Sequence, residues 1–203
     1  GAGGAARRAS LEEEKANQAA ELRELRVGCL AATALWMLLE VEATRARLPA
    51  AQYVPPLLQL ARRAAASRAM VADAPRVADA PSRSAPALAP ELAMAPVGAL
   101  SRLIALPAGL KAFSDLEGER LLLHLLKAGA PQLRRVAVAA LYQACSSSSL
   151  SCARVVASSS GPMALASIAL CRSEAAAVRA CALLALGCVV QAQGRCSGDV
   201  AEI

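Results

Sequence analysis

Aromatic side chains are nearly missing from this chain and make up 2% of its 203 residues. Sheets favour aromatic and β-branched residues, whereas alanine and leucine favour helices, so the composition argues against a β-rich fold. So few aromatics also leave little surface on which nucleic-acid bases could stack. The hydrophobic fraction is nevertheless 56%, enough for a core of aliphatic residues and alanine in one domain or one short repeat array.

Metal-ligating patterns are missing as well. His124 is the single histidine, and none of the seven cysteines forms a C-x-x-C pair. We therefore expect no metal and no cofactor. An odd number of cysteines without paired spacing is typical of reduced, buried thiols in a cytoplasmic or nuclear protein. His124 lies in the apolar segment LLLHLLK without a fixed acidic or cysteine partner, so we interpret it as structural.

Signals of catalysis and of membrane insertion are equally scarce. No serine has a nucleophile-elbow setting, and the initial GAGG follows no strand, so we expect no enzyme. We take Val27–Leu39 as the longest uncharged apolar run, which is shorter than the roughly 20 residues that cross a bilayer. The net charge of +6 comes from 22 basic and 16 acidic residues, but the arginines are scattered. That distribution does not favour nucleic acid as a partner.

What the chain does contain is a repeated apolar stripe with helical spacing. Small residues stand at i and i+3, and small or aliphatic residues at i+4 and i+7, as on the buried face of an amphipathic helix. Segment 133–141 (LRRVAVAAL) aligns without a gap with segment 178–186 (VRACALLAL), 45 residues later, and a period of this length indicates a helical repeat. The three copies of the stripe are Ala31/Ala34/Leu35/Leu38, Ala137/Ala140/Leu141/Ala144 and Ala182/Ala185/Leu186/Val189.

A second gap-free match aligns RLPAAQYVPPLL with RVVASSSGPMAL, 107 residues later. In both segments a short helix is predicted to end, and Pro55 or Pro162 is predicted to open the next helix, where a missing N–H costs nothing. A weaker form of the stripe, Pro96/Ala99/Leu100/Leu103, marks a further unit whose helix is expected to start late.

The chain start and the proline-rich segment set the expected boundaries. Residues 1–9 are interpreted as a flexible lead-in, and the capping box Ser10/Glu13 predicts the start of a helical stretch that breaks once before Leu48. Residues 72–96 hold five prolines and are interpreted as a disordered insert, either a passive spacer or a tether regulated at its serines. Because the chain starts at Gly1 rather than Met, we expect a fragment or a processed chain, belonging to a longer array. The expected repeats cover 10–71 and 97–191, and 192–203 would be the start of a further element or a tail.

The order of a short helix, a helix opened by Gly-Pro and a long helix bearing A-x-x-A-L-x-x-L resembles the armadillo repeat. HEAT repeats share this spacing and remain an alternative. The resemblance implies an all-α, right-handed superhelix of about four units, whose third helices line a groove for peptides or partner helices. The copies are residues 150–191, the clearest, then 107–146, then 42–106 with the insert, and a partial one at 10–40.

The groove implied by the resemblance departs from that of the nuclear-import adaptors. Their tryptophan and asparagine ladder would fall on Thr33, Ala139 and Leu184 and on Met37, Gln143 and Cys188, so the ladder is absent. Trp36 is one residue away from it, and we expect it to pack between helices. The predicted groove residues are Arg26, Leu30, Thr33, Met37, Gln132, Val136, Ala139, Gln143, Ala177, Cys181, Leu184 and Cys188.

This stripe is largely apolar, which marks either a partner site or a face covered by the same chain or a neighbouring repeat. We expect a non-enzymatic protein-interaction module that presents the groove to a peptide or helix of a protein partner, with no small-molecule substrate. Two alternatives remain open. One is the substrate-targeting segment of a larger enzyme such as a ubiquitin ligase, and the other is an armadillo-type Hsp70 cofactor.

Overall fold

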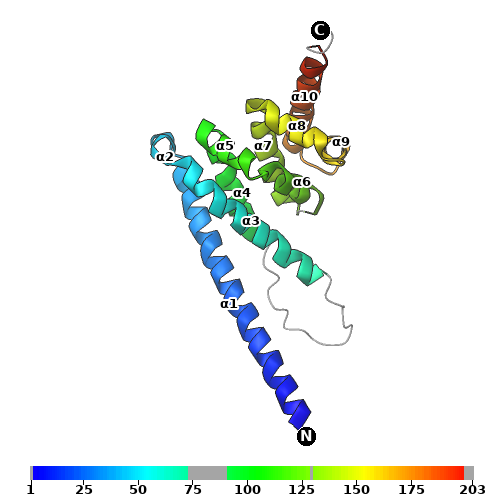
Figure 1. The fold of residues 1–203 in the computed structure, drawn as a ribbon. Helices are drawn as coiled ribbons and strands as arrows, with labels where there is room; N and C mark the ends of the chain where they lie inside the picture. Colours follow the sequence, from blue (N-terminus) through cyan, green and yellow to red (C-terminus); the bar gives the residue numbers. More distant parts are fainter. Residues whose placement is uncertain (1, 73–90, 129, 199–203) are drawn as a thin grey trace.

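The computed structural model describes residues 2–72, 91–128 and 130–198, and every regular element within these ranges is an α-helix (Figure 1). The all-α prediction is therefore confirmed. In chain order the helices are α1 (Ala2–Leu39), α2 (Glu42–Arg47), α3 (Ala50–Ala72), α4 (Glu91–Ile104), α5 (Pro107–Asp115), α6 (Gly118–Ala128), α7 (Pro131–Ser147), α8 (Ser149–Ala157), α9 (Gly161–Leu170) and α10 (Ala176–Gly198).

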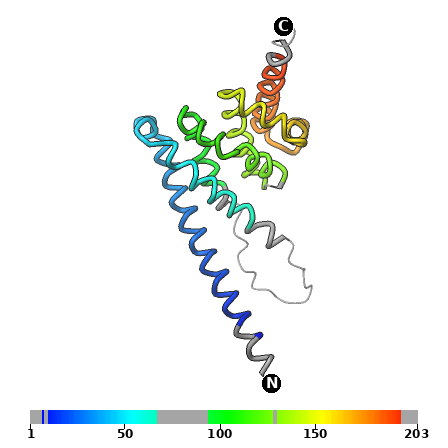
Figure 2. The backbone as a smooth tube through the Cα atoms, viewed as in Figure 1, coloured from blue at the N-terminus to red at the C-terminus, as the bar shows by residue number. Residues whose placement is uncertain are grey.

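After α1 the helices come in sets of one shorter helix and two longer ones. α2, α5 and α8 are the shorter helices, with six, nine and nine residues. The two longer helices of each set pack against one another, α3 on α4, α6 on α7 and α9 on α10. The sets are linked because α1, α4, α7 and α10 form a row in which each helix packs against the next (Figure 2). Buried side chains from every one of these helices except α2 join into one core.

The 45-residue period reappears in the helices themselves. α7 begins at Pro131 and α10 begins at Ala176. The offset between these two starts equals the offset between the two aligned sequence segments. The apolar stripe predicted on α7 is fully buried, and the stripe on α10 is buried except for the half-buried Leu186. Alanine predominates in these stripes because small side chains let neighbouring helix backbones approach closely.

The stripe predicted on α1 is not a buried face. Ala31 and Ala34 are exposed, and the side chain of Leu38 is 53% exposed. Burial on α1 falls instead on Ala32 and Leu39, one position along the helix. The physical reason is that α4, α7 and α10 each have a preceding helix in the row, whereas no described helix precedes α1.

The chain start and the helix breaks correct several expected boundaries. Residues 2–9 are helical rather than a flexible lead-in, because α1 begins at Ala2 and the local sequence is rich in alanine and arginine, both strong helix formers. Ser10 consequently lies inside α1 and caps nothing. The expected single break is confirmed at the turn between Leu39 and Glu42.

The proline-rich segment is shorter than predicted. α3 extends to Ala72 and α4 begins at Glu91, so the ends of the expected insert 72–96 are helical. Pro96 is buried inside α4, where its apolar ring contributes to the core and α4 lacks one backbone hydrogen bond. The centre of the insert, 73–90, lies outside the described residues. At the other end, residues 192–198 continue α10 instead of forming a separate element.

The two predicted proline starts have different outcomes. Pro162 stands in the first turn of α9, as predicted. Pro55 lies in the interior of α3, which begins five residues earlier at Ala50, so that prediction is wrong. The start of α9 also requires a glycine, since a Cβ on Gly161 would lie 2.2 Å from the carbonyl oxygen of Val155. This close contact lets the chain turn sharply from α8 into α9.

Candidate partner-binding face

The predicted groove residues form one stripe on each of three helices in the row. They recur at i, i+4, i+7 and i+11, so each set of four lies along one helix face. The sets are Arg26, Leu30, Thr33 and Met37 on α1; Gln132, Val136, Ala139 and Gln143 on α7; and Ala177, Cys181, Leu184 and Cys188 on α10.

Most of this stripe is open to solvent. All four residues on α1 are exposed, as are Ala139 on α7 and Leu184 on α10, whose side chain is 52% exposed. Val136, Cys181 and Cys188 are half-buried and pack against the core from the edge of the stripe. The face is therefore a surface with apolar contacts at its edge, and substitutions at the exposed positions leave the core intact.

The remaining helix of the row, α4, lies between α1 and α7 and interrupts the stripe, and none of the predicted groove residues belongs to it. At the same register α4 carries the buried Gly98, and the indole of Trp36 covers it, since a Cβ on Gly98 would lie 2.6 Å from the ring. Trp36 thus packs between α1 and α4, which confirms the expectation for this residue.

A paired charge occupies the next position along α4. Arg102 donates from Nε and Nη2 to the two carboxylate oxygens of Glu40, each at 2.9 Å. This two-pronged geometry fixes the plane of both groups. The polar side chain at the equivalent place on α7 is Gln143, which donates to the hydroxyl of Ser147 at 3.3 Å. The face is thus apolar on α10, mixed on α1, where Arg26 and Thr33 lie beside Leu30 and Met37, and polar near its middle.

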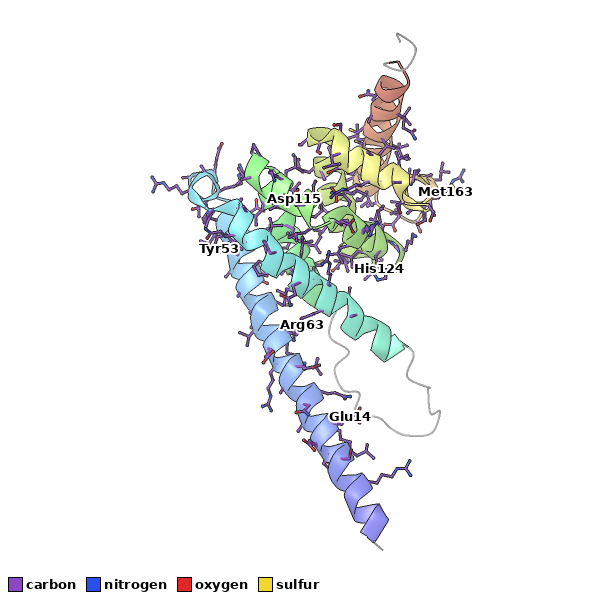
Figure 3. The ribbon with its side chains drawn as sticks, in the orientation of Figure 1. Glu14, Tyr53, Arg63, Asp115, His124 and Met163 are labelled. Atoms are coloured by element: carbon purple, nitrogen blue, oxygen red, sulfur yellow. The ribbon has the colours of Figure 1, made fainter. Side chains whose placement is uncertain are left out.

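His124, which the sequence analysis interprets as structural, is exposed and lines a cleft of about 410 Å³ between α6 and α8 (Figure 3). Basic side chains surround it, but most have partners within the chain. Arg120 pairs with Glu117 at 2.7 Å, and Lys127 donates to the hydroxyl of Ser160. Within the described ranges no group of three His, Cys, Asp or Glu side chains could hold a metal ion.

A buried carboxylate behind this cleft is a feature that sequence reasoning missed. Glu119 on α6 is 1% exposed, and its Oε1 accepts hydrogen bonds from Ser114 on α5 at 2.9 Å and from Ser151 on α8 at 2.6 Å. Arg154 approaches Oε2 at 3.5 Å. Three helices from two neighbouring sets therefore meet at one charge. We interpret the cluster as structural, because its acceptor is shielded from solvent and already occupied.

The cysteines divide by environment. Burial raises the pKa of the Cys29, Cys145 and Cys152 thiols, and Cys152 also donates to the carbonyl oxygen of Cys145 at 3.2 Å. A raised pKa keeps these thiols protonated and weakly nucleophilic. Cys171 differs, since its hydrogen bond with Ser173 lowers its pKa. The six cysteines with described side chains are all free thiols.

One helix segment, Ala176–Gly194 in α10, is long and apolar enough to cross a membrane by length and composition, and 22% of that window is buried. Within this segment, the uncharged stretch between Arg179 and Arg195 is longer than Val27–Leu39, which the sequence analysis took as the longest such run. A core helix passes the same test, and α10 packs against α7 and α9.

The chain matches no protein-family model, no curated protein and no solved structure.

Proposed function

We propose that the chain is an armadillo-like solenoid that works as a non-enzymatic protein-interaction module. The helix order supports the proposal, because each set of one short and two longer helices corresponds to one armadillo unit. α1 would then be the third helix of an incomplete first unit, and α4, α7 and α10 the third helices of three further units. Stacking of such units through nearest-neighbour contacts agrees with the packing of each of these helices against the next.

The observation that carries the proposed function is the exposed apolar face on the third helices. Leu30, Met37 and Leu184 are large hydrophobic side chains in the predicted stripe, and all three are more than half exposed. Apolar side chains that gather on one face usually mark a site for a protein partner. Gln143 and Arg102 would add hydrogen bonds near the middle of the face, so the partner is an extended peptide or helix with apolar side chains and carboxylate or carbonyl acceptors.

A random peptide display library panned against the full chain tests this function. Peptides that survive selection are measured by fluorescence polarisation against the unmodified chain and the exposed groove variants Met37→Glu and Leu184→Glu. Met163→Glu is the matched control, because Met163 is equally exposed but lies on α9, outside the stripe (Figure 3). We expect each groove variant to weaken binding at least about tenfold and the control to leave it unchanged.

Circular dichroism on all variants shows whether they keep the same helix content. Selected peptides that bind the two groove variants as tightly as the unmodified chain would refute the proposed function. Failure to select any peptide would count against it as well.

A further inference from the structure

In the row α1, α4, α7 and α10, each helix presents one side to the helix that follows it. We call this the forward side of the helix. It can be recognised by register, because two apolar positions seven residues apart are buried in every helix that has a successor. On α10 the same two positions are exposed, at 57% for Leu183 and 62% for Val190. The buried equivalents are Ala32 and Leu39 on α1, Val97 and Ile104 on α4, and Val138 and Cys145 on α7.

The backward side of the row shows the complementary arrangement. Leu133, Ala137, Ala140 and Ala144 of α7 are buried, and so are the residues 45 positions later on α10. On α1 the equivalent residues are Val27, Ala31, Ala34 and Leu38, and all four are exposed, Val27 at 66%. The two ends of the row therefore present the two halves of an interface that is already formed three times within the chain.

A charged pair follows the same register. Arg134 on α7 forms an ion pair with Glu174, eight residues before Ala182 and just ahead of α10. The equivalent of Arg134 on α10 is Arg179, whose Nε, like that of Arg134, is shielded from solvent without a hydrogen-bond partner. Within the part of the chain that the structure describes, the forward side of α10 thus lacks both the apolar cover that α10 supplies to α7 and an acidic partner of the kind that Glu174 supplies to Arg134.

We propose that a second copy of this chain supplies the apolar cover, so that α10 of one molecule docks on α1 of the next. α1 carries the small-residue stripe that the register requires, whereas the position eight residues before Ala31 is Arg23 and the neighbouring Glu24 pairs with Arg63 at 3.6 Å, so α1 does not reproduce the acidic partner. Around Gly187 and Gly194 of α10 no other atom lies within 4 Å of an added Cβ, so a helix backbone can approach there. The contact would continue the existing α7–α10 interface, and it does not depend on the proposed groove function.

Such an interface is heterologous, because each copy contributes a different surface, and it leads to open chains of molecules rather than a closed pair. This property gives a sharp test. Leu183→Glu with Val190→Glu removes the forward surface, and Ala34→Glu with Leu38→Glu removes the backward surface. All four positions are exposed, so both double variants are expected to fold.

Sedimentation velocity over a wide concentration range measures the association. We expect the unmodified chain and the control Met163→Glu to form assemblies that grow with concentration. Each double variant alone should associate at least about 100-fold more weakly, because an unpaired carboxylate buried in an apolar contact is strongly unfavourable. An equimolar mixture of the two double variants should form a 1:1 dimer and nothing larger, since one intact surface of each kind remains.

Three results would overturn the proposal. The first is an unmodified chain that stays monomeric at all concentrations. The second is a double variant that still associates with itself, which would indicate an interface between like surfaces. The third concerns lipid, the other environment that suits an apolar helix. A monomeric chain that binds neutral phospholipid vesicles through Leu183 and Val190 would assign this face of α10 to a membrane.

Discussion

Replacing Glu119 by alanine is the most informative change in the core, because one carboxylate joins three helices. The substitution removes the acceptor of two hydrogen bonds, from Ser114 at 2.9 Å and from Ser151 at 2.6 Å. It also removes the partner of Arg154 at 3.5 Å. α5, α6 and α8 lose their shared anchor, and with it a link between two neighbouring helix sets.

The size of the effect follows from what each group can do afterwards. A hydrogen bond to a charged acceptor contributes about 1.5–3 kcal/mol, so the two serine bonds together represent about 3–6 kcal/mol. Part of this is recovered, because the hydroxyls of Ser114 and Ser151 lie 3.1 Å apart and can still bond to one another. The Arg154 side chain is 29% exposed and can be hydrated. We therefore expect a loss of about 3 kcal/mol in the free energy of unfolding.

For a chain of this length that loss corresponds to a Tm lower by about 6–12 °C. Urea and thermal denaturation followed by circular dichroism measure both quantities, and Glu119→Gln, which keeps an acceptor oxygen, should lose about half as much. In a double-mutant cycle with Ser151→Ala the two losses should not be additive, because the residues share one bond. A loss below about 1 kcal/mol for Glu119→Ala, or full additivity in the cycle, would refute the reasoning.

Three further predictions address the thiols and the apolar stripe. Because burial raises the pKa of Cys145, the unfolded chain releases this proton first, so stability should fall above about pH 9, by up to about 1.4 kcal/mol per pH unit; urea midpoints at pH 8–10.5 should show a smaller slope for Cys145→Ala. Cys171 should react with iodoacetamide faster than Cys145, and Ser173→Ala should slow it, as mass spectrometry of the modified peptides can show; equal rates would contradict the assigned environments. Ala137→Glu should cost at least about 3 kcal/mol, whereas Ala31→Glu should stay within about 0.5 kcal/mol in dilute solution, and thermal melts that show similar losses would contradict the different burial of the two stripes.

The sequence was sufficient for the features that depend on local pattern. Helix content follows from a composition rich in alanine and leucine, and the 45-residue period predicted that α7 and α10 are equivalent before either helix was seen. The stripes around Leu141 and Leu186 are buried because each lies between two other helices. The proline at the start of α9 was predictable for a similar reason, since its position in the first turn is decided by local geometry.

Features that depend on distant parts of the chain were not predictable in this way. Glu119 reads as an ordinary residue near a helix start, and its burial depends on two serines from other helices, one of them 32 residues later. The contact of Trp36 with Gly98 joins residues on either side of the proline-rich segment. No spacing rule connects such pairs, because the distance between them in sequence is decided by the turns and inserts in between.

The stripe on α1 shows why a correct pattern can still be assigned the wrong environment. Ala31, Ala34 and Leu38 have the spacing of the buried stripes on α7 and α10, and yet they are exposed. A periodic pattern specifies which face of a helix is suited to packing, but burial also requires a neighbour on that side. In a row of similar helices every internal member has two neighbours, whereas each end member has one. The residue positions that are buried in the middle of such a row are therefore exposed at its two ends, as the stripe on α1 and the pair Leu183 and Val190 on α10 both are.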